Sequence, residues 1–238
     1  EAAIKGMIQS IEQAEKFPGR YPVYTPPVEH RANPAEPVPR RARSADPPQQ
    51  AARKYQPGVP YRLYRSTRLL SREHLLDPMY LSTLASTVAE LVSIEGPIHH
   101  DLLIERLKEL HGVQRAGSNV QANIESALRS AAQDGLVTHE HRSPFYRRKG
   151  KSLRSFRLPI DGLRRPIEQV AADEIALAVL YLVEDQFGVA EDQLPAAVAR
   201  LFGIERLPSE SADLIRAVTD DLVQKGALRR SGSQLHLA

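Results

Sequence analysis

Positive charge and aromatic rings are concentrated in residues 139–157, which carry seven Lys and Arg side chains against one acidic residue. Cations of this density suit phosphate contacts, and aromatic rings stack on bases, so the combination is typical of nucleic-acid binding. The candidate phosphate contacts are Arg142, Arg147, Arg148, Lys149, Lys151, Arg154 and Arg157, with Phe145, Tyr146 and Phe156 among them. A basic, solvated loop is the alternative interpretation of the same residues.

The segment before this cluster predicts a helix with one apolar and one polar face. Val120, Ile124, Ala127, Leu128 and Ala131 recur at helical spacing, Ser118 stands at the N-cap position, and Gly135 follows the helix as a left-handed C-terminal cap. The outward face then carries Asn119, Ser126 and Arg129 as candidate DNA contacts. Glu125 on the same face opposes DNA binding, because a carboxylate repels phosphate.

Catalytic chemistry finds little support. The chain has no cysteine, which excludes zinc fingers, disulfides and thiol nucleophiles. Gly150-Lys151-Ser152 looks like the end of a phosphate-binding loop, but Phe145 occupies the position that needs the first glycine. A weaker hypothesis is a metal-dependent hydrolase, with His99 or His100 approaching His139 and His141. We expect no enzyme, no cofactor and no metal in this chain.

Residues 167–224 are strongly acidic, with twelve Asp and Glu against three Lys and Arg. Their spacing, Glu174 included, follows the outer faces of predicted helices, so we interpret them as solvated. A helix that presents Asp213 and Asp220 outward repels phosphate, which favours a protein contact for this part of the chain.

Three predicted helices and a hairpin must position the basic cluster. From Pro78 onward, apolar residues at helical spacing mark one helix over 81–92, a second over 101–111 and the third from Ser118. Two short extended runs follow, over 136–140 and 145–148. This order of elements describes a winged helix, whose third helix enters the major groove while the hairpin contacts the backbone.

The same pattern occurs twice. When the chain is shifted by 91 residues, positions 84–137 lie over 175–228 without a gap and share thirteen identities in 54 positions. Ile124 meets Ile215 and Gly135 meets Gly226, so the identities fall at core and turn positions. The fold class predicted is therefore mainly α with short β-hairpins: tandem winged-helix repeats, at residues 78–158 and 167–238, after a proline-rich linker.

The residues before the repeats differ in composition. Residues 1–16 predict an amphipathic helix, which we interpret as the terminal helix of a truncated upstream, nuclease-like domain. Residues 17–77 form a proline-rich basic linker, because eleven of the 18 prolines lie between residues 17 and 60 and prevent helix or sheet. Tyr55, Tyr61 and Tyr64 are expected to anchor the linker on the following domain.

Two short elements carry a family resemblance: Gly96-Pro97-Ile98-His99 before the second helix, and Arg115-Ala116-Gly117-Ser118 before the third. Residues 78–238 resemble a C-terminal module of unknown function at the end of large bacterial helicase-related proteins of superfamily I. Such proteins commonly carry a restriction-endonuclease-like domain just upstream. The resemblance implies a parent protein with ATP-driven work on nucleic acid, and it implies no catalytic residue in this chain.

These observations predict a non-catalytic region that binds DNA through the third helix and basic wing of the first copy. The alternative is a protein-interaction module that docks on the upstream domains or on a second subunit. No apolar run reaches the roughly 18–20 residues of a membrane span, so we expect a cytoplasmic protein without membrane partners. The preference for a DNA sequence or for single or double strands stays open, as do the oligomeric state and whether the second winged helix binds protein at all.

Overall fold

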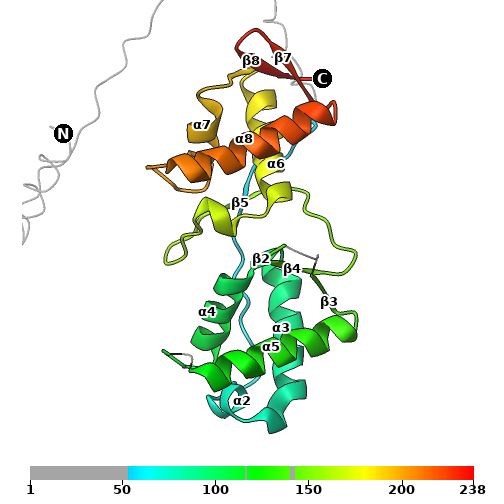
Figure 1. Ribbon diagram of the computed structural model, residues 1–238, viewed down its shortest axis with the longest axis vertical. Coiled ribbons are helices and arrows are strands. Elements are labelled where there is room, and N and C mark those ends of the chain that lie inside the picture. The colour runs from blue at the N-terminus through cyan, green and yellow to red at the C-terminus, as the bar shows by residue number, and fades with distance from the viewer. Residues whose placement is uncertain (1–52, 116, 140–142) are drawn as a thin grey trace, which may run out of the picture. The chain divides into compact units, whose positions relative to one another are not determined.

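The computed structural model describes residues 53–115, 117–139 and 143–238. The predicted helix over 1–16, most of the predicted linker and Arg142 lie outside these residues. The described residues belong to one compact unit, residues 50–238. This unit is mainly helical with short strands (Figure 1). None of the helices in the described ranges is long and apolar enough to cross a membrane.

Residues 81–148 form what we call the first half, with three helices and a three-stranded antiparallel sheet. The helices are α3 (Leu81–Glu95), α4 (His100–Leu110) and α5 (Ser118–Gln133), and the strands are β2 (Ile98–His99), β3 (Val137–His139) and β4 (Phe145–Arg148). The strand order is β2-β4-β3, and Tyr146 pairs with both Ile98 and His139. The predicted helices and the first hairpin are therefore confirmed.

Residues 172–237 form the second half, which repeats this order of elements. Its helices are α6 (Ala172–Asp185), α7 (Leu194–Leu201) and α8 (Ser209–Gln224), and its strands are β6 (Val189–Ala190), β7 (Leu228–Ser231) and β8 (Gln234–Leu237). The strand order is β6-β8-β7. Helix α8 begins and ends 91 residues after α5, and both helices lead through a turn into a hairpin (Figure 1).

Equivalent positions of the two halves have the same physical role. Ile124 and Ile215 are both fully buried, at the centre of separate hydrophobic cores. Gly135 and Gly226 follow α5 and α8 with φ of 69° and 70°, a left-handed conformation that favours glycine. The N-cap of α5 is Gly117 rather than Ser118, because the backbone of Ser118 is already helical.

A segment that precedes the first half contacts both cores. Residues 53–64, which we call the strap, include β1 (Val59–Pro60), which pairs in parallel with β5 (Arg157–Leu158). Tyr55 packs against the second core, whereas Tyr64 is buried in the first. The backbone amides of Lys54 and Tyr55 donate to the carboxylate of Glu184, at 2.7 and 2.8 Å. The predicted tyrosine anchors are thus present at the end of the predicted linker.

Three short helices complete the unit. Helix α2 (Glu73–Leu76) lies within the predicted linker, and its Leu75 is fully buried in the first core. Two 3-10 helices, η1 (Pro78–Tyr80) and η2 (Ile167–Gln169), precede α3 and α6. The linker composition missed α2 because a four-residue helix gives almost no periodic signal.

Candidate functional site

The outward face of α5 is polar and exposed, opposite the buried Ile124. Asn119 lies in its first turn and Arg129 three turns later, both exposed. The Ser126 hydroxyl is half-buried; it donates to the carbonyl of Ala122 at 2.8 Å and accepts from the Arg129 guanidinium at 3.0 Å. The structure therefore brings the three predicted helix residues to one face, with Arg129 held at one end by Ser126.

The loop after β4 carries cations and no acidic side chain: residues 143–157 contain six Lys and Arg and no Asp or Glu. Arg148, Lys149, Lys151 and Arg154 are exposed. Lys149 lies beside the turn that ends α5, since its Nζ is 3.9 Å from where a Cβ on Gly135 would be. Lys151 donates to the carbonyl of Ser93 at 2.9 Å. Within the described ranges, no carboxylate pairs with Arg148, Lys149 or Arg154.

Arg147 and Arg157 belong to the same basic cluster in the sequence but already have carboxylate partners. Arg147 pairs with Asp173 at 2.9 Å, at the start of α6. Arg157 is buried against Glu174, and its aromatic neighbour Phe156 is buried in the second core. The expectation that Arg157 and Phe156 face nucleic acid is wrong, because both side chains are buried, Phe156 in the second core and Arg157 against Glu174.

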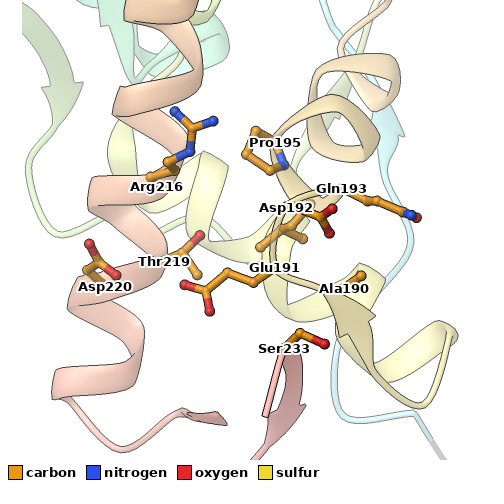
Figure 2. Close-up of a pocket in the computed structure, with 10 residues that line it drawn as sticks. Ala190, Glu191, Asp192, Gln193, Pro195, Arg216, Thr219, Asp220 and Ser233 are labelled. Atoms are coloured by element: carbon orange, nitrogen blue, oxygen red, sulfur yellow. The ribbon is translucent and has the colours of Figure 1, made fainter. Parts of the chain in front are cut away.

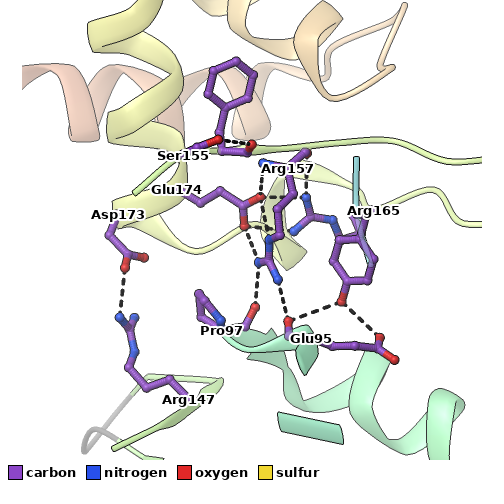
Figure 3. A network of polar contacts seen from close by, with 10 residues as sticks. Glu95, Pro97, Arg147, Ser155, Arg157, Arg165, Asp173 and Glu174 are labelled. Carbon is purple, nitrogen blue, oxygen red and sulfur yellow. Dashed lines mark hydrogen bonds and ion pairs between the residues drawn. The ribbon is translucent and has the colours of Figure 1, made fainter. Parts of the chain in front are cut away.

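Glu174 is the centre of a buried ionic cluster, contrary to its predicted place on a solvated face (Figure 3). Its carboxylate accepts hydrogen bonds from Arg157 and from both terminal nitrogens of Arg165, the latter at 2.9 and 2.8 Å. Although burial works to raise the pKa of Glu174, hydrogen bonds and charge from Arg165 and Arg157 outweigh it and hold that pKa below its usual value.

The cluster also joins the two halves. Arg157 donates to the carbonyls of Glu95 and Pro97, which lie at the end of α3, and thereby connects them to Glu174 of α6 (Figure 3). Tyr61 of the strap donates to the Glu95 carboxylate at 3.1 Å. Burial, followed by the charge of Glu95, raises the pKa of Tyr61 well above its usual value. We interpret these contacts as structural, because each side chain of the cluster forms its hydrogen bonds with other members of the cluster.

Each half has a groove at the same place, between the outward face of its last helix and the start of the helix before it. The first groove measures about 300 Å³, and its lining consists of His100, Glu125, Leu128, Arg129, Ala132, His139 and Tyr146. The second groove measures about 690 Å³, and Figure 2 shows Arg216, Thr219 and Asp220 on one side of it, with Glu191 and Asp192 on the other. Four lining positions correspond at the 91-residue offset: 100 with 191, 125 with 216, 128 with 219 and 129 with 220.

The first groove has an aromatic wall. The ring of His139 stacks on that of Tyr146, with centroids 4.6 Å apart and planes 19° from parallel. The ring of His100 also lies against this tyrosine, with ring centroids 5.9 Å apart. Burial, together with the charge of Glu125, raises the pKa of Tyr146 above its usual value, so the phenol is neutral at pH 7. His100 and His139 therefore both lie against Tyr146.

The histidines do not assemble a metal site within the described ranges, where no group of three His, Asp or Glu side chains is placed to hold an ion. His99 instead caps α4: its Nδ1 accepts from the amide of Asp101 at 3.2 Å, and its ring meets the edge of Phe145. His141, the fourth residue of that hypothesis, lies outside the described residues.

A family model identifies part of this chain. Residues 73–122 match DUF3320, a protein family of unknown function. The match runs from α2 to the first turn of α5 and so includes His100 and Asn119, while Ser126, Arg129 and the loop after β4 follow it. No curated protein and no solved structure matches the chain. The match therefore shows a domain of unknown function at residues 73–122.

The second half differs from the first in charge. Helix α8 contains four acidic residues and one arginine, whereas α5 contains one of each sign. Cations around the second groove are paired with carboxylates: Arg216 with Asp213 at 2.6 Å, and Arg230 with Glu191 at 2.8 Å and with Asp220. The two halves therefore have similar folds but surfaces of different charge. The first has cations without a carboxylate partner in the described residues, whereas acidic residues of the second pair with arginines.

Proposed function

We propose that residues 78–238 are tandem winged helices and that the first binds duplex DNA through α5 and the loop after β4. Three helices followed by an antiparallel hairpin, twice in the chain, support the winged-helix assignment. The observation that carries the DNA-binding proposal is the set of Arg148, Lys149 and Arg154, exposed and without a carboxylate partner in the described residues. Such cations gain free energy by releasing counterions from DNA.

In this proposal the two parts of the site have different tasks. Helix α5 enters the major groove, where Asn119, Ser126 and Arg129 contact base edges or adjacent phosphates. The loop cations contact the phosphate backbone and fix the position of the protein without reading sequence. Lys151 contributes charge even though one of its protons is donated to Ser93. Arg147 contributes less, because Asp173 offsets its charge.

The parent protein follows from the same proposal. Residues 78–238 serve as a non-catalytic C-terminal region of a helicase-related protein, with upstream domains as further partners. The match of residues 73–122 to DUF3320 supports the proposal that this region is a module found in other proteins. The resemblance described above supports the helicase context. The region itself needs no cofactor, since DNA binding of this kind uses only charge and hydrogen bonds.

Salt-dependent DNA titration of the 238-residue chain tests the proposal. Changing Arg148, Lys149 and Arg154 together to Ala is expected to weaken binding to unrelated duplexes alike. Each lost phosphate contact lowers the slope of log affinity against log salt by about 0.9, so three contacts lower it by about 2.7. Arg129→Ala is expected to change affinity by a factor that depends on the DNA sequence.

A matched control removes the same charge elsewhere. Arg200, Arg206 and Arg229 are exposed cations of the second half, and their joint change to Ala lowers the net charge equally. This variant is expected to retain the slope of the unmodified chain. Equal slopes for both triple variants would overturn DNA binding at the loop.

The second candidate function is protein docking, favoured by the acidic surface of α8. Under this alternative the region contacts basic surfaces of the upstream domains or of a second subunit. Unchanged DNA affinity in the loop variant, together with lost association in an Asp213→Asn, Asp220→Asn variant, would establish docking instead.

A further inference from the structure

We infer that the first groove holds a single unpaired nucleobase, stacked on His139 and hydrogen-bonded to Glu125. This inference rests on the proposed DNA binding and names the substrate as DNA with an unpaired base beside a duplex. The groove lies between the two parts of the proposed interface, since Arg129 lines it and His139 belongs to the hairpin that leads to the cationic loop.

The stacking surface is braced from behind. His139 is exposed, and one face of its ring rests on Tyr146, which is half-buried on the central strand of the sheet. A ring supported in this way loses little freedom when a base stacks on its other face. Stacking of one base on an aromatic side chain raises affinity by roughly five- to hundredfold.

Glu125 gives the groove its polar selectivity. Its side chain is exposed, and no cation of the described residues pairs with it. A carboxylate only accepts hydrogen bonds, so it selects a base edge with donors. Guanine presents two adjacent donors, its ring N–H and its amino group, and matches the two oxygens best. In a duplex these donors are used by the paired cytosine, so the contact requires an unpaired base.

This assignment explains a residue that duplex binding alone leaves unexplained. Glu125 repels phosphates from the centre of α5, which is unfavourable on a helix that contacts only a duplex backbone. Opposite a base edge the same charge is favourable, and Arg129, one turn away and lining the same groove, is placed for the phosphate of that nucleotide.

The second groove shows that the fold alone does not create such a site. It lies at the equivalent position, but no aromatic side chain lines it. Glu191 replaces His100, Arg216 replaces Glu125 and Asp220 replaces Arg129.

The first groove, of about 300 Å³, is at the small end of the range for ligand pockets and suits one base rather than a larger ligand.

The test compares five DNA probes by fluorescence anisotropy with the 238-residue chain at constant salt. The probes share one duplex and carry a blunt end, a short single-stranded dG extension or a dT extension, each extension at either strand end. The unmodified chain is expected to bind the dG extension at least fivefold more tightly than the blunt duplex. Equal affinity for all probes would overturn the inference.

Two variants of His139 separate stacking from folding. His139→Ala is expected to reduce affinity for the extended probes to that of the blunt duplex, with an unchanged salt slope. His139→Phe retains a stacking ring and is expected to preserve the advantage of the extension. Loss of blunt-duplex binding in His139→Ala, or no loss of the advantage, would contradict the inference.

Glu125→Gln tests the hydrogen bond, and Arg216→Gln in the second groove is its matched control. The first is expected to remove most of the preference for dG over dT, and the second to leave it unchanged. Failure of the two proposals is distinguishable. If only the extension effects are absent, duplex binding stands without the base site; if the loop variant binds blunt duplex normally, duplex binding itself fails.

Discussion

Changing Glu174 to Gln is expected to destabilise the folded chain strongly, although the side chain keeps its size. Glu174 is fully buried, and its carboxylate accepts hydrogen bonds from the backbone and side chain of Arg157 and from Arg165. An amide removes the negative charge and turns one acceptor into a donor that faces guanidinium groups. Two buried arginines then lose their counter-charge.

The size of the effect follows from the burial. Removing one partner of a buried ion pair costs about 3–5 kcal/mol, because the remaining charge is left without compensation in a medium of low dielectric constant. Both arginines are themselves buried, at 7% and 6% exposure, so water offers little screening. For a unit of this size, that loss corresponds to a decrease in Tm of roughly 6–20 °C.

Urea unfolding followed by circular dichroism measures the change. Asp221→Asn is the matched control, since its partner Lys225 is an exposed neighbour on α8 at 2.6 Å, and pairs of this kind contribute about 0–1 kcal/mol. A loss for Glu174→Gln no larger than that for Asp221→Asn would refute the account of the cluster.

Two further predictions concern stability and the boundaries of the folding unit. Burial lowers the pKa of His111 below its usual value of 6.5, so the folded state prefers the neutral ring. Stability is therefore expected to fall as the pH drops below about 6.5 towards the folded-state value, and to fall less in His111→Gln, in urea unfolding at pH 7 and pH 5.5. Residues 70–166 alone lack both Tyr61 and Glu174, so we expect this fragment to be cleaved by protease much faster than residues 53–238; equal resistance would contradict a shared unit.

The local elements were predictable from the sequence because each depends on its own residues. The apolar stripe around Ile124 and the glycine at 135 suffice to place α5, and the 91-residue repeat places α8 once α5 is known. The hairpin strand over 145–148 agrees with the predicted extended run. The expected mainly helical structure with short strands is confirmed.

The ionic partners were not predictable in the same way. Glu174 lies beside Asp173 in an acidic stretch, and only its position near Arg157 and Arg165 decides that it is buried. Arg157 likewise lies in a segment with the composition of a basic loop, but it belongs to β5 and is buried. The grooves were missed because their walls come from separate elements, four of them in the first groove. The differences between positions 125 and 216 and between 129 and 220 were the available signal.

The strap has a consequence for the order in which the chain folds during synthesis. The contact of Lys54 with Glu184 spans 130 residues, so the strap leaves the ribosome long before its second anchoring site exists. At about 5–20 residues per second, that interval is roughly 7–26 s. Residues 81–148 are synthesised within this interval, whereas Glu174 follows Arg157 by only 17 residues. The contact of the strap with Glu184 therefore forms late, after both partners of the buried Arg157–Glu174 pair have been synthesised.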